Sequence, residues 1–167
     1  MKNRRLTSLS AAAALFATTF AHAETVVIEA AQYLDVVQGR LVAPAVIVVE
    51  GEKIAAINPA TRPANARTID LGGQTLLPGL MDSHTHLNYD IVEGWETEPV
   101  RFTAGDYALR GTVNARKTLM AGFTTVRDMG PTWPFVDVDL RNAINEGAIP
   151  GPRMLVAGNY VSSTGGA

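Results

Sequence analysis

The chain contains no cysteine in its 167 residues. Disulfide bonds are therefore excluded, and so is the lipid-modified N-terminal cysteine of an anchored exported protein. A chain of this length can be stable without such links, because it is long enough to bury a sizeable core. Hydrophobic residues make up 47% and charged residues 18%, which is typical of a globular protein and not of a disordered one.

The sequence also has no apolar run of the length that a membrane-spanning helix needs, about 20 residues. The apolar stretch at residues 6–21 follows the basic start MKNRR and leads into AHA at residues 21–23, which has the small-x-small form of a secretory cleavage site. We therefore predict that residues 1–23 are a secretory signal peptide. A periplasmic or secreted protein without a stable membrane anchor is the expected product.

Positive charge is scarce. Cleavage after Ala23 would remove Lys2, Arg4 and Arg5 but no acidic residue, so the three lost charges take the formal net charge from −2 to −5. A mildly acidic domain offers no basic stripe for phosphate groups. No nucleic-acid partner is expected.

Residues 24–77 have the pattern of short β-strands. The stretches TVVIEAAQYLDVV, PAVIVVEGEKIAAI and ARTIDLGGQTLL are rich in Val, Ile and Thr and are separated by turn residues. Residues 50–53 (EGEK) and the pair Gly72-Gly73 each predict a hairpin turn. This segment is expected to form a small β-unit.

A different pattern begins after Pro78-Gly79. Thr103 and Asp106 have the spacing of a capping box, which predicts a helix start, and Gly122 suits the left-handed residue at a helix end. Between them lie apolar positions with helical spacing, which predict one stripe on the helix: Ala108, Leu109, Val113, Ala115, Leu119 and Met120.

The remaining segments alternate between strand and helix. FTTVRD predicts a buried strand, residues 134–146 predict a second helix that stops at Gly147, and RMLVAG predicts a further strand. From Leu76 onward the order is strand, helix, strand, helix, strand. This alternation indicates parallel strands joined by right-handed crossovers, which places the chain in the α/β class.

Histidine is scarce too, and two of the three occur in DSHTH as His84 and His86. Residues i and i+2 of a strand point the same way, with Cα atoms about 7 Å apart, so two such imidazoles can converge on one metal ion. Asp82 would share their face and Ser83 would lie on the other. The alternative is a chance pair on a strand. The position of the pair at the carboxyl end of the first parallel strand, where α/β barrels place their active sites, favours a metal site.

LLPGLMDSHTHL resembles the signature of the metal-dependent amidohydrolase superfamily. MAGFTTVRDMG and AIPGPRMLVAGNYVSSTGG resemble the second strand and the approach to the third strand in the imidazolonepropionase-like and Xaa-Pro dipeptidase-like branch, and VIVVEGEKIAAINP is similar to the flanking β-sandwich. The resemblance implies that residues 78–167 are the start of a (β/α)8 barrel of the TIM type, about three strands of it. Residues 24–77 would be the N-terminal part of a composite β-sandwich.

The resemblance also implies the chemistry. His84 and His86 would bind a divalent metal ion, with Zn²⁺ as the first candidate and one or two ions in the complete enzyme, and the ion would activate water. Asp82 would either orient an imidazole from the second coordination shell or cap the barrel floor. The implied function is the hydrolysis of C–N bonds in an amide, peptide or cyclic amide, with a dipeptide or another small molecule as substrate. Deamination is the alternative within the superfamily.

Several groups that the resemblance requires are missing from this sequence. Such enzymes typically use a bridging carboxylated lysine or glutamate, two further histidines and a proton-shuttling aspartate. After residue 23 the only lysines are Lys53 and Lys117, and no histidine follows His86. We expect an N-terminal fragment that is inactive alone, with its catalytic aspartate further along the gene. A truncated, non-catalytic product is the alternative.

Other residues have two interpretations. Gly165 and Gly166 correspond to a substrate loop of the family but also suit a plain turn. Arg127 and Asp128 end the predicted second strand and could reach the substrate, but an ion pair that joins the strands is favoured. Trp95 and Trp133 are expected in loops, packed against their own domain.

Overall fold

The computed structural model describes residues 24–163, and the chain divides between Leu76 and Leu77 into two compact units. The predicted signal peptide, residues 1–23, lies outside the described residues, as do Gly165 and Gly166. The predicted domain limits at residues 23 and 77 therefore stay predictions. Within the described range, no helix combines the length and apolar character that crossing a bilayer requires.

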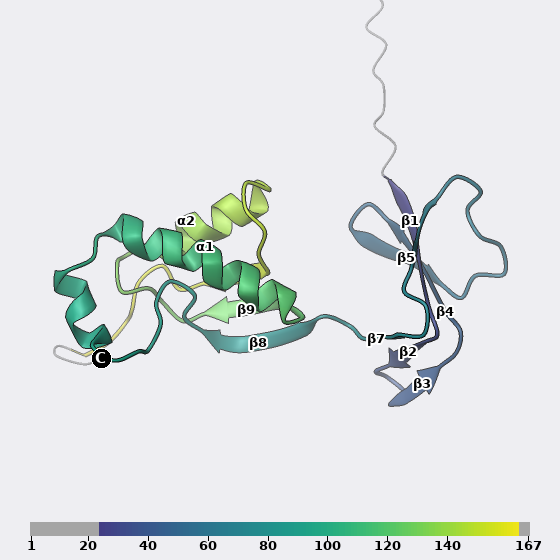
Figure 1. Ribbon diagram of the computed structural model, residues 1–167, viewed down its shortest axis with the longest axis horizontal. Coiled ribbons are helices and arrows are strands. Elements are labelled where there is room, and N and C mark those ends of the chain that lie inside the picture. Colours follow the sequence, from purple (N-terminus) through teal and green to yellow (C-terminus); the bar gives the residue numbers. More distant parts are fainter. Residues whose placement is uncertain (1–23, 164–167) are drawn as a thin grey trace, which may run out of the picture. The chain divides into compact units, whose positions relative to one another are not determined.

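The first unit consists of two small mixed sheets (Figure 1). One has the strand order β5-β4-β1-β6 and is built from β1 (Thr25–Ala30), β4 (Ala45–Glu50), β5 (Lys53–Ile57) and β6 (Arg67–Asp70). The other has the order β3-β2-β7 and is built from β2 (Gln32–Asp35), β3 (Arg40–Val42) and β7 (Thr75–Leu76). Val27, Val46 and Val48 form the buried cluster of this unit. That the sheets make part of a sandwich stays a prediction.

One of the two predicted hairpin turns is correct. β4 and β5 pair antiparallel through Glu50 and Lys53, and Gly51 between them has a φ of 59°. The turn at Gly72-Gly73 does not join a hairpin, because β6 pairs with β1 while β7 pairs with β2. A glycine pair specifies a turn locally, but it does not specify which sheet receives the next strand.

The second unit has the predicted alternation. β8 (Leu80–Thr85), α1 (Ala104–Met120), β9 (Phe123–Asp128), α2 (Val136–Asn145) and β10 (Arg153–Val156) follow one another. The strands form a parallel sheet of order β10-β9-β8, against which both helices pack (Figure 1). The sequence did not predict the short 3-10 helix η1 (Trp95–Val100), which precedes α1. Closure of these strands into a barrel stays a prediction.

Helix α1 begins and ends as predicted. The Thr103 side chain accepts a hydrogen bond from the backbone N–H of Asp106, and the Asp106 carboxylate accepts one from the backbone N–H of Thr103. Gly122 follows the helix with a φ of 97°. Both terminal signals act within one turn of chain, which is why they can be read from the sequence.

The predicted apolar stripe of α1 is wrong in part. Leu109, Val113 and Met120 are 70%, 52% and 74% exposed, whereas Tyr107, Gly111 and Ala115 are the buried residues. Small residues permit close packing, and a Cβ at Gly111 would lie only 2.6 Å from Nδ2 of Asn88. The helix therefore packs through its small residues, and apolar character alone did not identify that face.

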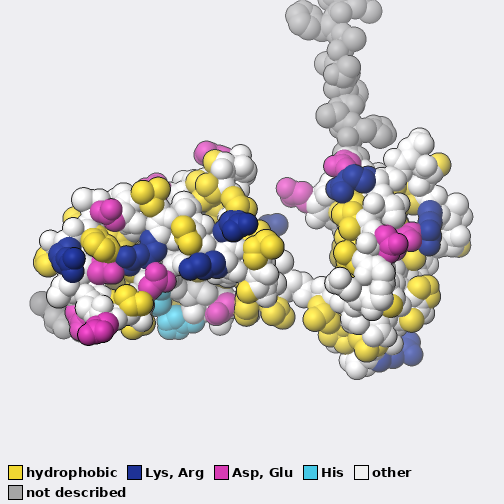
Figure 2. Space-filling view, viewed as in Figure 1, with side chains coloured by type: hydrophobic (Ala, Val, Ile, Leu, Met, Phe, Trp, Pro, Cys, Tyr) yellow, Lys and Arg dark blue, Asp and Glu magenta, His cyan; other side chains and the backbone are white. Residues whose placement is uncertain are grey.

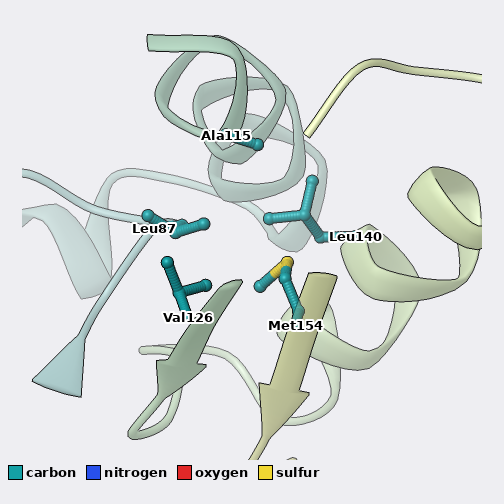
Figure 3. Packing of buried hydrophobic residues seen from close by; sticks show 5 residues of the cluster. All are labelled: Leu87, Ala115, Val126, Leu140 and Met154. Carbon is teal, nitrogen blue, oxygen red and sulfur yellow. The ribbon is translucent and has the colours of Figure 1, made fainter. Parts of the chain in front are cut away.

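The core of the second unit lies between the helices and the sheet. Figure 3 shows five buried side chains that point toward one another, contributed by the chain after β8, by both helices and by β9 and β10: Leu87, Ala115, Val126, Leu140 and Met154. Burying each larger aliphatic side chain contributes roughly 1.5–3 kcal/mol. This packing fixes the carboxyl ends of the strands, where the histidine pair lies.

Candidate active site

The end of strand β8 brings the two histidines together. His84 is the penultimate residue of β8, and His86 follows directly after the strand ends at Thr85. Their ring centroids are 5.3 Å apart and the ring planes meet at 68°. Figure 2 shows the histidine side chains, coloured cyan, gathered at the surface of this unit. The arrangement is open to an ion or a small molecule from solvent.

The ring of His86 has a defined orientation. Its Nδ1 lies 2.9 Å from the carbonyl oxygen of Gly130, which can only accept a hydrogen bond, so Nδ1 carries the proton. The lone pair of Nε2 is then free for a metal ion. Orientation of a metal-binding imidazole by a backbone carbonyl is a common arrangement in metalloproteins.

Tyr160 shares the same carbonyl. Its hydroxyl donates to Gly130 O at 2.8 Å and lies 3.5 Å from Nδ1 of His86. The ordinary pKa of a tyrosine hydroxyl already lies well above neutral pH, and burial raises the pKa of Tyr160 further, so the hydroxyl is a donor at neutral pH. Gly130 has a φ of 127°, and a Cβ there would lie 2.8 Å from the Tyr160 ring. Only glycine suits this position.

Asp128 holds the backbone in place next to His86 and at Gly130. It is 1% exposed, and its Oδ2 accepts from the backbone N–H of Leu87 at 2.7 Å while Oδ1 accepts from that of Gly130 at 3.2 Å. It thus holds the residue that follows His86 and the residue whose carbonyl orients the imidazole. Burial raises the pKa of Asp128, and the two backbone N–H groups oppose that rise.

The expected ion pair between Arg127 and Asp128 is wrong. Arg127 donates through Nε to the carbonyl oxygen of Ser83 at 2.9 Å, and neither residue takes part in an ion pair within residues 24–163. Successive strand residues point to opposite faces, so adjacent side chains cannot readily pair. The two residues instead tie β9 to β8 and to the chain after it by separate backbone contacts.

Asp82 does not orient an imidazole in the described structure. Its Oδ1 accepts a hydrogen bond from the backbone N–H of His84 at 2.9 Å. The side chain thereby shapes the backbone at the first histidine. Its predicted place in the second coordination shell of a bound metal, and the alternative of a cap on the barrel floor, both stay predictions.

A cavity of about 540 Å³ opens beside the histidine pair. Its lining combines imidazole, aromatic, methionine and hydroxyl side chains: His84, His86, Tyr89, Trp95, Met129, Thr132 and Tyr160. Trp95, which was expected in a loop, is the first residue of η1, and its side chain packs against Tyr89 of its own unit as part of this lining. The sequence did not predict four other residues of the lining: Tyr89, Met129, Thr132 and Tyr160. A usable signal was present, since each of them follows the carboxyl end of a parallel strand, where α/β enzymes gather their site residues.

The residues present fit one part of a metal centre. Within residues 24–163 no three His, Asp or Glu side chains are placed to hold one ion. Zinc prefers four ligands, and two imidazoles with one nitrogen fixed by hydrogen bonding are a suitable pair among them. A complete centre needs donors in addition to His84 and His86.

Comparison with known proteins gives consistent results. The chain is 49% identical over 49 residues to an imidazolonepropionase of Arthrobacter sp. (strain FB24), which covers 29% of this chain and 12% of that protein. It is 40% identical over 91 residues to a dihydroorotase of Elusimicrobium minutum (strain Pei191), covering 54% of this chain and 18% of the relative. The chain thus spans less than a fifth of the length of these two curated relatives.

A solved structure matches over most of the chain. A Xaa-Pro dipeptidase with bound methionine in its active site superposes with a TM-score of 0.76 at 33% identity, over 86% of this chain and 35% of that chain. Residues 75–165, more than half of the sequence, match the amidohydrolase family, which confirms the resemblance seen in DSHTH and its flanking motifs. The chain therefore belongs to the amidohydrolase family.

Proposed function

We propose that this chain provides the first metal ligands of a hydrolase that cleaves carbon–nitrogen bonds in amides, peptides or cyclic amides. The observation that carries the proposal is the His84–His86 pair, with ring centroids 5.3 Å apart and Nδ1 of His86 directed at the Gly130 carbonyl. A strand end that presents two imidazoles, one of them with a fixed tautomer, is suited to metal binding. Family membership favours this use over a chance pair.

The ion in this proposal is divalent, and Zn²⁺ is the first candidate because imidazole nitrogens suit it. When bound, such an ion lowers the pKa of water to about 7 and polarises a carbonyl group. His84 and His86 would hold the ion. Gly130, Tyr160 and Asp128 would keep the His86 ring in place through the hydrogen bonds described above.

A dipeptide is the favoured substrate class. The Xaa-Pro dipeptidase matches 86% of this chain, a larger share than either curated relative covers. A cyclic amide is the second candidate, since the dihydroorotase is 40% identical over 91 residues. Both substrates contain a carbon–nitrogen bond next to a carbonyl. A metal ion held by His84 and His86 would therefore suit either of them.

The proposed activity can be tested on the protein at the length that its gene encodes, purified with zinc. We expect release of proline from Xaa-Pro dipeptides, loss of that activity after dialysis against a chelator, and its return when zinc is added. Dihydroorotate serves as the comparison substrate. Cleavage of dihydroorotate alone would select the cyclic-amide candidate. Failure to cleave a carbon–nitrogen bond in either substrate would contradict the proposal.

We further propose that the protein is exported to the periplasm or secreted. The support is the basic start, the apolar stretch and the AHA motif within residues 1–23. The mature protein is expected to begin at Glu24. N-terminal sequencing that finds Met1 retained would contradict this.

A further inference from the structure

One side of the cavity is an aromatic wall, made of Tyr89 and Trp95. Their rings are stacked, with centroids 6.3 Å apart and an angle of 11° between the planes. Tyr89 in turn lies 5.0 Å from the ring of His86. Both rings are therefore part of the cavity lining, and Tyr89 lies directly beside a proposed metal ligand.

Helix α1 holds the segment that carries Tyr89. The Asn114 side chain on α1 donates to the carbonyl oxygen of Leu87 at 3.1 Å and to the carboxylate of Asp90 at 3.0 Å. These two contacts lie on either side of Tyr89 in the chain. The turn that carries Tyr89 is thus held against α1 on both sides of this residue.

The same helix holds the segment that carries Trp95. Glu98 of η1 is 8% exposed and accepts a hydrogen bond from Arg110 of α1 at 2.6 Å. The guanidinium carbon of Arg110 also lies 5.1 Å from the centre of the Phe102 ring. A shielded charge pair of this kind is hard to separate, because each charge would lose its partner while still partly buried. The two chain segments that carry the rings are therefore held in place by contacts within the protein.

The lining also restricts what can bind. Among the described residues, the cavity lining includes no Asp, Glu, Lys or Arg side chain. Flat aromatic rings attract apolar groups, and they favour other aromatic rings through offset or edge contacts. An acidic side chain next to this wall would lose water without gaining a partner.

We propose that Tyr89 and Trp95 form a subsite for an apolar, preferentially aromatic, side chain of the substrate, next to the bond that is cleaved. Trp95 is then a specificity-determining residue. The inference rests on the proposed function for the choice of a dipeptide as substrate. The presence of the two aromatic rings in the cavity lining does not depend on it. A preorganised wall improves binding because less side-chain freedom is lost on association.

The test compares two dipeptide analogues whose peptide bond is reduced to CH₂–N, so that neither can be hydrolysed. One has the side chains of Phe-Pro and the other those of Gly-Pro, and their dissociation constants are measured by calorimetry on the protein at its encoded length. We expect the Phe analogue to bind roughly tenfold more tightly, from burial of the ring and its aromatic contacts. Trp95→Ala should reduce this preference to about twofold or less, and Trp95→Phe should keep most of it.

Trp133→Ala is the matched control, because Trp133 is 39% exposed, similar to Trp95 at 41%, yet is not part of the cavity lining. It should leave the preference for the Phe analogue unchanged. A preference that survives Trp95→Ala, or equal binding of both analogues to the unaltered protein, would overturn the subsite. Failure of the proposed function has a different signature. The protein would then bind the Phe analogue through Trp95 but cleave neither Phe-Pro nor Gly-Pro.

Discussion

His84→Ala and His86→Ala are each expected to weaken zinc binding by at least about 100-fold and to remove hydrolysis with it. Loss of a residue that only orients a ligand already weakens metal binding by about 10–100-fold, and loss of the ligand itself should weaken it more. Each variant leaves one histidine among the described residues, so no other imidazole there can take the place of the lost ligand. Zinc content after dialysis against a metal buffer, measured by elemental analysis, gives the result without an activity assay.

Ser83→Ala is the control for the histidine variants. Ser83 lies between Asp82 and His84 on β8, and the contact it makes with Arg127 uses its backbone carbonyl, which the substitution keeps. Zinc content should therefore be unchanged. If both histidine variants keep the zinc content of the unaltered protein, DSHTH is a strand without a metal role.

Asp128→Ala is expected to lower the free energy of unfolding by about 2–6 kcal/mol. The substitution leaves the backbone N–H groups of Leu87 and Gly130 without their acceptor, and each unsatisfied buried group costs about 1–3 kcal/mol. The same change releases the Gly130 carbonyl that orients His86, so zinc affinity should fall as well. Urea unfolding measures the first effect, through a lower midpoint at an unchanged slope.

Asp139→Ala provides the comparison for this loss. Asp139 is an exposed acidic residue in the first turn of α2, where its charge contributes at most about 0.3–1 kcal/mol through the helix dipole. A much smaller effect on the midpoint is therefore expected. Equal stability of Asp128→Ala and the unaltered protein would mean that Leu87 and Gly130 find other acceptors, and the bracing role of Asp128 would be wrong.

Features that depend on neighbouring residues could be predicted from the sequence. The capping box of Thr103 and Asp106, the left-handed Gly122 and the hairpin at residues 50–53 each involve groups within a few positions of one another. The closeness of His84 and His86 belongs to the same class, because it follows from the spacing of side chains along one strand end. The strand-helix alternation of the second unit was predictable for a similar reason, since it depends on local periodicity.

Features that join distant segments were decided by tertiary packing. Asp128 lies 41 residues from Leu87, and Tyr160 lies 74 residues from His86, so no local pattern pairs them. The predicted Arg127–Asp128 pair failed because adjacent strand residues face opposite ways, and the role of Trp95 depends on where Arg110 anchors η1. Side-chain identity limits which contacts are chemically possible. Which of them form depends on the elements that the core brings together.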